Sequence, residues 1–155
     1  IQKEWFVRQL GMAKELKLPV IIHSREAAAD TFEILKQEKT SECSMVMHCY
    51  SYSSEMAKDY LKMGFYLGIG GVLTFKNGKK LKETVAEAPM EQLLLETDCP
   101  YLAPVPYRGK RNDSRKLVLV AEELGRIKGI SADEVIRISE ENARRFFRLE
   151  QEERL

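Results

Sequence analysis

The chain has 155 residues, of which 44% are hydrophobic and 32% charged, and this composition is typical of one soluble globular domain spanning residues 1–155. Its formal net charge of +1 excludes a global positive field that would attract nucleic acid, so any such binding must come from a local basic patch. No apolar run approaches the length of a membrane span and no stretch has the pattern of a signal peptide, so we expect no membrane partner.

The first predicted element is an amphipathic helix, whose apolar residues recur at helical spacing as far as Leu16 and which ends before Pro19. Residues 20–22 then form a short buried strand ending on His23, and Ser24 is the expected N-cap of the next helix. That helix runs into the charged stretch 36–39. After a polar turn at 40–42, residues 45–47 form a second apolar strand, which ends on His48.

Ser53 or Ser54 is expected to cap a third helix, which Gly64 closes, and residues 65–69 form a third strand running into Gly70. A helix over about residues 79–87 follows, and then a fourth strand of three leucines at 93–95. Three consecutive leucines, without alternation, suit a strand buried on both faces of a parallel sheet. This strand stops at the carboxylates Glu96 and Asp98, and the prolines that follow forbid its extension.

Two further helices are predicted after the proline-rich loop. The first begins near Asp113 and stops at Gly129, and the second opens with the capping box Ser131–Glu134. We expect their apolar positions to be buried, namely Leu117, Val120, Ala121, Leu124, Ile127, Val135, Ile138, Phe146 and Phe147. The tail at residues 150–155 is expected to be frayed.

The strand ends recur regularly, at His23, His48, Gly70 and Asp98, with spacings of 25, 22 and 28 residues. Each interval holds one amphipathic helix, which predicts successive βα units with parallel strands and therefore the α/β class. Four strands are too few to close a parallel barrel, which takes eight strands and about 200 residues or more. The pattern therefore leaves two architectures: an open, doubly wound sheet of four strands, or the last half of a barrel.

Both histidines of the chain lie at the end of a predicted strand, and Asp98 occupies the equivalent point two units later. The carboxyl ends of parallel strands point into the functional crevice of such folds. Imidazole and carboxylate groups are ligands suited to Zn²⁺, Mn²⁺ or similar ions, and strand ends supply the rigidity that a metal site needs. We therefore interpret His23, His48 and Asp98 as candidate metal ligands.

The three cysteines, Cys43, Cys49 and Cys99, are odd in number and lack CxxC spacing. They predict neither a disulfide framework nor a zinc knuckle, and a reducing cytoplasm is the simplest location for the protein. We expect Cys49 and Cys99 to be small, buried packing residues.

Several motifs resemble, in order and over nearly the whole chain, those of the TatD family of metal-dependent hydrolases. They are Pro19-Val-Ile-Ile-His-Ser-Arg-Glu-Ala27, His48-Cys-Tyr-Ser51, Gly64-Phe-Tyr-Leu-Gly-Ile-Gly-Gly71, Phe75-Lys-Asn77, Leu94-Leu-Glu-Thr-Asp-Cys-Pro-Tyr-Leu102, Arg108-Gly-Lys-Arg-Asn112 and Asn142-Ala-Arg-Arg-Phe146. One departure is Tyr52, which stands where the family commonly has glycine. A tyrosine there is expected to crowd the loop after the second strand and to affect substrate entry.

The resemblance implies a (β/α)8 TIM barrel of the amidohydrolase-like type, of which this chain would be the C-terminal half and therefore incomplete. It implies a deoxyribonuclease with two divalent ions, Mg²⁺, Mn²⁺ or Zn²⁺. By analogy His23 and His48 would hold one ion together with a glutamate. Asp98 would hold the other together with a His-x-His pair and would also be the catalytic residue that accepts a proton from the attacking water. Neither that glutamate nor the His-x-His pair is in this sequence, so we expect the chain alone to be inactive.

DNA is the implied substrate, and basic residues beside the ligands are the candidates for binding it. Arg25 follows the first candidate ligand closely, and Arg108, Lys110 and Arg111 follow the fourth strand. Phosphate contacts of this kind bind without reading base sequence. Residues 76–80 contain a third basic cluster, for which a solvated surface is the simpler interpretation.

Two other functions remain open at this point. The same metal geometry would also suit a hydrolase of a small amide or ester. Alternatively, the chain is a truncated, non-catalytic fragment whose unpaired sheet edges favour association. The sequence does not fix the oligomeric state.

Overall fold

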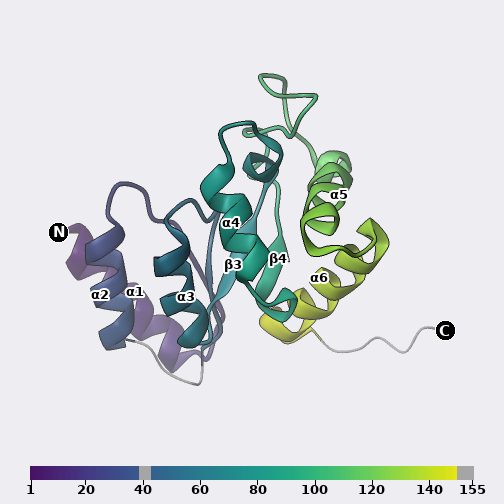
Figure 1. The fold of residues 1–155 in the computed structure, drawn as a ribbon. Coiled ribbons are helices and arrows are strands. Elements are labelled where there is room, and N and C mark those ends of the chain that lie inside the picture. Colours follow the sequence, from purple (N-terminus) through teal and green to yellow (C-terminus); the bar gives the residue numbers. More distant parts are fainter. Residues whose placement is uncertain (39–42, 150–155) are drawn as a thin grey trace.

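The computed structural model describes residues 1–38 and 43–149, which form a single four-stranded sheet flanked by helices (Figure 1). The strands β1 (Val20–Ile22), β2 (Met45–Met47), β3 (Tyr66–Ile69) and β4 (Leu93–Leu95) lie in the order β1-β2-β3-β4 and every pair is parallel. Ile22 pairs with Met47, Met47 with Leu67, and Ile69 with Leu95. The register therefore aligns the carboxyl ends of all four strands at one edge of the sheet.

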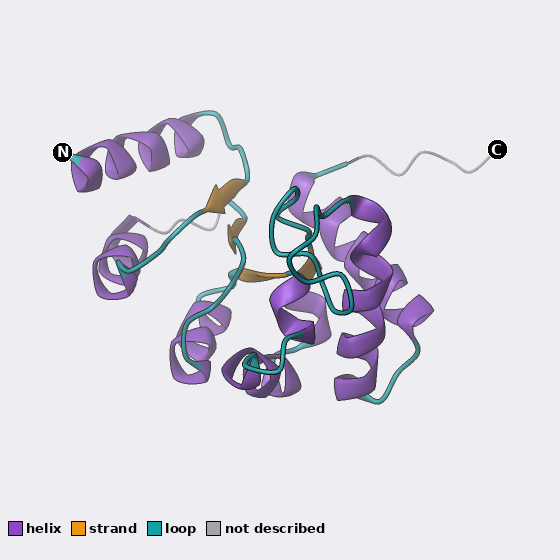
Figure 2. Ribbon diagram, turned by 90° about the horizontal axis from the view of Figure 1, so that it is seen from above, coloured by secondary structure: helices purple, strands orange, loops and turns teal. Residues whose placement is uncertain are grey.

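Within the described ranges, six α-helices precede, connect or follow the strands: α1 (Gln2–Glu15), α2 (Ala28–Glu38), α3 (Ser54–Lys62), α4 (Lys79–Glu87), α5 (Leu117–Lys128) and α6 (Ala132–Phe147). Seen from above, they form an arc around one side of the curved sheet (Figure 2). A doubly wound sheet has a reversal in strand order and helices on both faces. The sequential order and the arc therefore favour a TIM-barrel-like arrangement over the doubly wound alternative.

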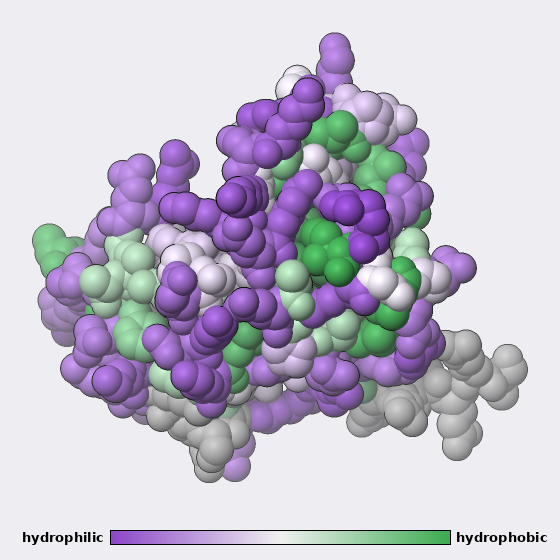
Figure 3. All heavy atoms as spheres, viewed as in Figure 1, coloured by the Kyte–Doolittle hydropathy of each residue, from purple (hydrophilic) through white to green (hydrophobic). Residues whose placement is uncertain are grey.

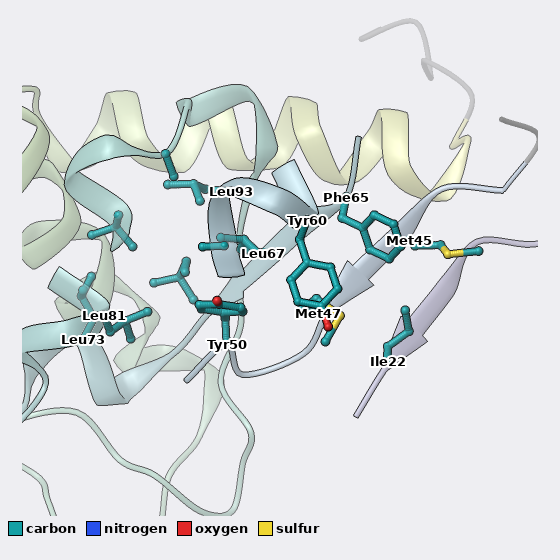
Figure 4. Close-up of a cluster of buried hydrophobic side chains, with 14 of the residues drawn as sticks. Ile22, Met45, Met47, Tyr50, Tyr60, Phe65, Leu67, Leu73, Leu81 and Leu93 are labelled. Atoms are coloured by element: carbon teal, nitrogen blue, oxygen red, sulfur yellow. The ribbon is translucent and has the colours of Figure 1, made fainter. Parts of the chain in front are cut away.

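The main core lies between this helical arc and one face of the sheet (Figure 4). Met45, Met47, Leu67 and Leu93 project from neighbouring strands into it. Tyr60 and Phe65 are fully buried there, with ring centroids 5.4 Å apart. Burial of this continuous apolar surface is the main stabilising contribution to the fold.

The opposite face of the sheet carries a smaller cluster, in which Phe146 from the end of α6 packs on Val46 and Leu94. These residues alternate with the core residues of β2 and β4, as a strand's period of two requires. Two polar side chains of α6 also bind β4, since Ser139 Oγ accepts the Leu95 N–H at 2.9 Å and Asn142 Nδ2 donates to the Leu93 carbonyl at 2.8 Å. These two side chains of α6 thereby satisfy backbone N–H and carbonyl groups on the edge of β4 that does not pair with β3.

The β1 side of the sheet is more open than predicted. Ile21 is 59% exposed, so the expectation of a buried first strand is wrong at this position. A groove of about 430 Å³ lies between α1 and β1, lined by Leu10, Ala13, Val20 and His23 among others. The reason is that β1 is an edge strand of the described sheet, with a ladder on one side only.

Most of the predicted helix ends are confirmed. Ser53 caps α3 and Ser131 caps α6, each accepting a backbone N–H three residues ahead, and Gly129 ends α5 with φ +72°. The expected burial of Phe147 is wrong, because this side chain is 41% exposed at the last position of α6. The expected turn at 40–42 and the frayed tail lie outside the described residues.

The face of the molecule seen in Figure 3 is mostly hydrophilic, with smaller hydrophobic areas between the polar side chains. Among residues 1–38 and 43–149, no helix is both long and apolar enough to span a membrane.

Candidate metal centre

The parallel register brings the two histidines and two acidic residues together at the carboxyl edge of the sheet. The ring centroids of His23 and His48 lie 5.9 Å apart, with 40° between the ring planes. His48 Nε2 is 3.3 Å from Asp98 Oδ1, and His48 Nδ1 is 2.6 Å from Glu96 Oε2. The predicted residues 23, 48 and 98 are therefore neighbours, and Glu96 joins them.

Glu96 is fitted closely against the sheet. Its carboxylate lies over Gly68 of β3, where an added Cβ would come within 2.7 Å of Oε2. The side chain is about one-fifth exposed, as is that of His48. The absence of a side chain at position 68 thus creates the space from which Glu96 reaches His48.

The electrostatics of the site follow from burial and from this pairing. Burial of the His48 ring acts to lower its pKa, but the hydrogen bonds and negative charges of Glu96 and Asp98 outweigh it and raise the pKa above 6.5. Burial raises the pKa of Glu96, against the opposing effect of His48 and of the Cys49 N–H. Both groups therefore bind a proton more readily than they would in water.

Two residues of the candidate site turn the chain sharply. Asp98 and Cys49 both have left-handed backbone conformations, with φ of +52° and +47°.

Burial and the charges of Glu96 and Asp98 raise the pKa of the Cys49 thiol to about 12, so this cysteine stays protonated and is not a nucleophile. The expectation that both cysteines are buried is wrong, because Cys49 is half-buried and Cys99 is exposed.

These donors fit a divalent cation in their chemistry. Imidazole nitrogens and carboxylate oxygens are ligands that Zn²⁺ and Mn²⁺ accept, and His48 Nε2 lies 3.3 Å from Asp98 Oδ1. Glu96 Oε1 is buried and has no hydrogen-bond partner among the described residues. Within residues 1–38 and 43–149, however, no group of three or more His, Cys, Asp or Glu side chains is arranged to hold an ion.

The predicted substrate-binding residues Arg108, Lys110 and Arg111 are exposed on the loop after β4, which protrudes at the top of the view in Figure 1. They line a cleft of about 450 Å³ together with Phe75 and Tyr101. The Arg108 guanidinium lies over the Phe75 ring at 4.5 Å, a favourable cation–π distance. Arg25 is exposed after β1, and Lys76, Lys79 and Lys80 are exposed around the start of α4.

Asn112 holds this basic loop against the candidate site. Its buried side chain donates hydrogen bonds to the carbonyls of Thr97 at 2.7 Å and Tyr101 at 2.8 Å. The two carbonyls flank Asp98, so one amide closes the loop that carries both the acidic residue and the basic residues.

Sequence reasoning missed Glu96 as a site residue. The available signal was its position two residues before Asp98, because residues i and i+2 of an extended chain point to the same side. It also misassigned Ser24, which does not cap a helix, since α2 begins four residues later at Ala28. The Ser24 hydroxyl instead contacts the hydroxyls of Thr31 and Tyr52.

Comparison with known proteins identifies clear relatives. The family model described as "TatD related DNase" matches residues 1–148. The chain is 48% identical over 149 residues to the uncharacterized metal-dependent hydrolase YabD of Bacillus subtilis and 40% identical to YcfH of Escherichia coli K12. In both cases the match covers 96% of this chain but only 58% and 56% of the relative, so the chain spans little more than half their length.

Solved structures give the same result for the fold. The crystal structure of YJJV, a TatD homolog from Escherichia coli K12, superposes with a TM-score of 0.84 at 30% identity, covering 92% of this chain and 54% of that one. A TatD family hydrolase from Entamoeba histolytica superposes with a TM-score of 0.78 at 22% identity, covering 90% and 54%. The α/β fold with its parallel sheet is thus of the same type as in these neighbours.

Proposed function

This chain belongs to the family described as TatD related DNase, and on that premise we propose that it acts in metal-dependent hydrolysis of DNA phosphodiester bonds. The observation that carries the proposal is the convergence of His23, His48 and Asp98 at one edge of the sheet. Because the described residues do not form a group of three metal ligands, a complete two-ion site would need ligands from outside them.

His23, His48 and Asp98 are the residues that would hold the ions. When bound, a divalent ion supplies positive charge for the phosphate and lowers the pKa of a coordinated water toward neutrality. Asp98 Oδ1 would accept the proton of the attacking water, as a carboxylate beside the reacting atoms can. Glu96 accepts a hydrogen bond from Nδ1 of His48, which leaves Nε2 directed toward Asp98 and available as a ligand.

The basic residues would hold the substrate. Lys110 and Arg111 are exposed beside the cleft, and Arg108 is fixed over Phe75. Arg25 lies on the neighbouring loop, two residues beyond His23. Contacts from these groups to phosphate oxygens would position a strand across the carboxyl edge without selecting its base sequence.

The test is hydrolysis of labelled single-stranded DNA, beside a panel of small esters and amides, with Mg²⁺, Mn²⁺ or Zn²⁺. The purified protein for this test joins residues 1–155 to a segment that supplies the remaining ligands. We expect cleavage of DNA that chelator removes and metal restores. Asp98→Asn should reduce the rate by at least about a hundredfold. Asp133→Asn, a change of the same chemistry in the first turn of α6, should leave it intact.

Turnover of the small esters or amides without DNA cleavage would replace the nuclease proposal with an amidohydrolase-type one. Residues 1–155 by themselves should cleave little or no DNA, because residues 1–38 and 43–149 contain no complete ligand set. Robust metal-dependent cleavage by those residues alone would contradict the need for further ligands.

A further inference from the structure

Three hydroxyl groups form a chain of hydrogen bonds between the connection after β1 and the connection after β2. Ser24 Oγ lies 2.7 Å from the Tyr52 phenol oxygen and 2.7 Å from Thr31 Oγ1. Ser24 directly follows His23, and Tyr52 lies four residues beyond His48. The chain of hydroxyls therefore joins the two segments that carry the imidazoles.

The backbone next to His23 has little support of its own. The last ladder bond at this end of β1 runs from the His48 N–H to the Ile22 carbonyl at 2.9 Å, and the first bond of α2 runs from Thr31 to Ala27. Between them, in the described part of the chain, residues 23–26 make no backbone–backbone hydrogen bond. The ladder between β1 and β2 therefore ends before His23 and does not by itself fix where the His23 ring lies.

Tyr52, by contrast, is held by a well-packed segment. Its ring contacts Tyr50 edge-to-face, with centroids 6.0 Å apart. Tyr50 is buried, and its phenol donates to the Ser53 carbonyl at 2.6 Å. Ser53 in turn caps α3 by accepting the Met56 N–H. The phenol of Tyr52 is thus a fixed point from which Ser24 is held.

We propose that Tyr52 is a positioning residue that acts through Ser24 to hold the His23 imidazole beside that of His48. The inference rests on the proposed function, because the separation of the two rings matters if both bind metal. The sequence predicts that Tyr52 crowds this loop, and in the structure its phenol links the connection after β2 to the connection after β1. Tyr52→Phe removes the hydroxyl that contacts Ser24 but keeps the ring that packs on Tyr50.

The first measurement needs no metal. In histidine-labelled protein, with the His23 signal identified by its loss in His23→Asn, the two imidazoles should show a nuclear Overhauser cross-peak. Tyr52→Phe and Ser24→Ala should each reduce it at least about twofold, while Tyr66→Phe, whose ring packs on Phe146 in the other cluster, should preserve it. An undiminished cross-peak in folded Tyr52→Phe and Ser24→Ala proteins would overturn the proposal.

The second measurement is Zn²⁺ binding by equilibrium dialysis, on the protein with a complete ligand set that the hydrolysis test uses. Loss of a group that bonds a metal ligand directly typically weakens metal binding about tenfold or more. Tyr52 acts one step further out, through Ser24, so Tyr52→Phe should raise Kd roughly three- to tenfold. The double variant with Ser24→Ala should raise it no further, because both changes break one connection. A weaker cross-peak with unchanged Kd would show a purely structural tie and refute positioning.

The two measurements also separate this inference from the proposed function. If the protein with a complete ligand set binds no Zn²⁺, Mn²⁺ or Mg²⁺, the proposed function fails whatever the cross-peaks show. If it binds metal and Tyr52→Phe changes neither the cross-peak nor Kd, the role of Tyr52 fails and the proposed function stands.

Discussion

Gly68→Ala is expected to break the contact between Glu96 and His48 without changing either residue. The new methyl carbon would lie 2.7 Å from Glu96 Oε2 and 3.2 Å from the Met47 carbonyl oxygen. The carbonyl belongs to β2 and yields little, so the carboxylate must retreat by about 0.7 Å to reach ordinary contact distance. Oε2 is the atom that lies 2.6 Å from His48 Nδ1, so this hydrogen bond lengthens beyond its strong range.

The cost has two parts. Overpacking a tight site costs about 1–3 kcal/mol, and a hydrogen bond to a charged group contributes about 1.5–3 kcal/mol. Since part of the strain is relieved by the carboxylate's movement, we expect a loss of about 2–3 kcal/mol in the free energy of unfolding. The pKa of His48 should also fall, because burial of the ring acts to lower it and Glu96 is the main group that raises it.

Urea unfolding and an NMR titration of the His48 ring measure both effects. Gly11→Ala in α1 is the matched control, because an added Cβ there meets no atom within 4 Å. It should stabilise the protein by up to about 1 kcal/mol, as alanine does in a helix, and leave the pKa of His48 unchanged. In a Glu96→Ala background the Gly68→Ala cost should shrink, since the atom in the way is gone. An unchanged His48 pKa in Gly68→Ala would refute this account of the site.

Two further predictions concern the loop and the helices. Asn112→Ala leaves the carbonyls of Thr97 and Tyr101 without their donor and should lower the free energy of unfolding by about 2–3 kcal/mol. Trypsin should then cut faster after Arg108, Lys110 or Arg111. The control Asn77→Ala, at an exposed position, should not change the rate of cleavage. Glu123 accepts from Arg126 and pairs with Lys82 of α4 at 2.7 Å, and these contacts lower its pKa to about 2. A lowered folded-state pKa stabilises the protein above the unfolded value of 4.5, and this effect is lost as pH falls through about 2. Glu123→Gln should therefore cost about 1 kcal/mol in the free energy of unfolding at pH 7 and only a small part of that near pH 2, measured by urea unfolding. An equally large difference in stability between Glu123→Gln and the unmodified protein at low pH would contradict the role of the Glu123 charge.

The sequence predicted those features that depend on neighbouring residues along the chain. The apolar triplets 45–47 and 93–95 form strands of a sheet that is covered on both of its faces, as continuous apolar runs indicate. Ser53 and Ser131 cap helices because a serine hydroxyl reaches the backbone N–H three residues ahead. The regular spacing of the strand ends likewise indicates, from residue order alone, that His23, His48 and Asp98 share one edge of the sheet.

Tertiary structure decided the partners of those side chains. Glu96 meets His48 across 48 positions of sequence only because the strand register aligns their ends and Gly68 between them has no side chain. Ser24 has the local signature of a helix cap, but a stronger set of partners, Thr31 and Tyr52, is available in the folded chain. Ile21 is exposed because β1 lies at the edge, a fact of strand order that its own apolar sequence does not carry. Local chemistry therefore fixed the elements and their ends, whereas distances between side chains depended on the packing of whole strands.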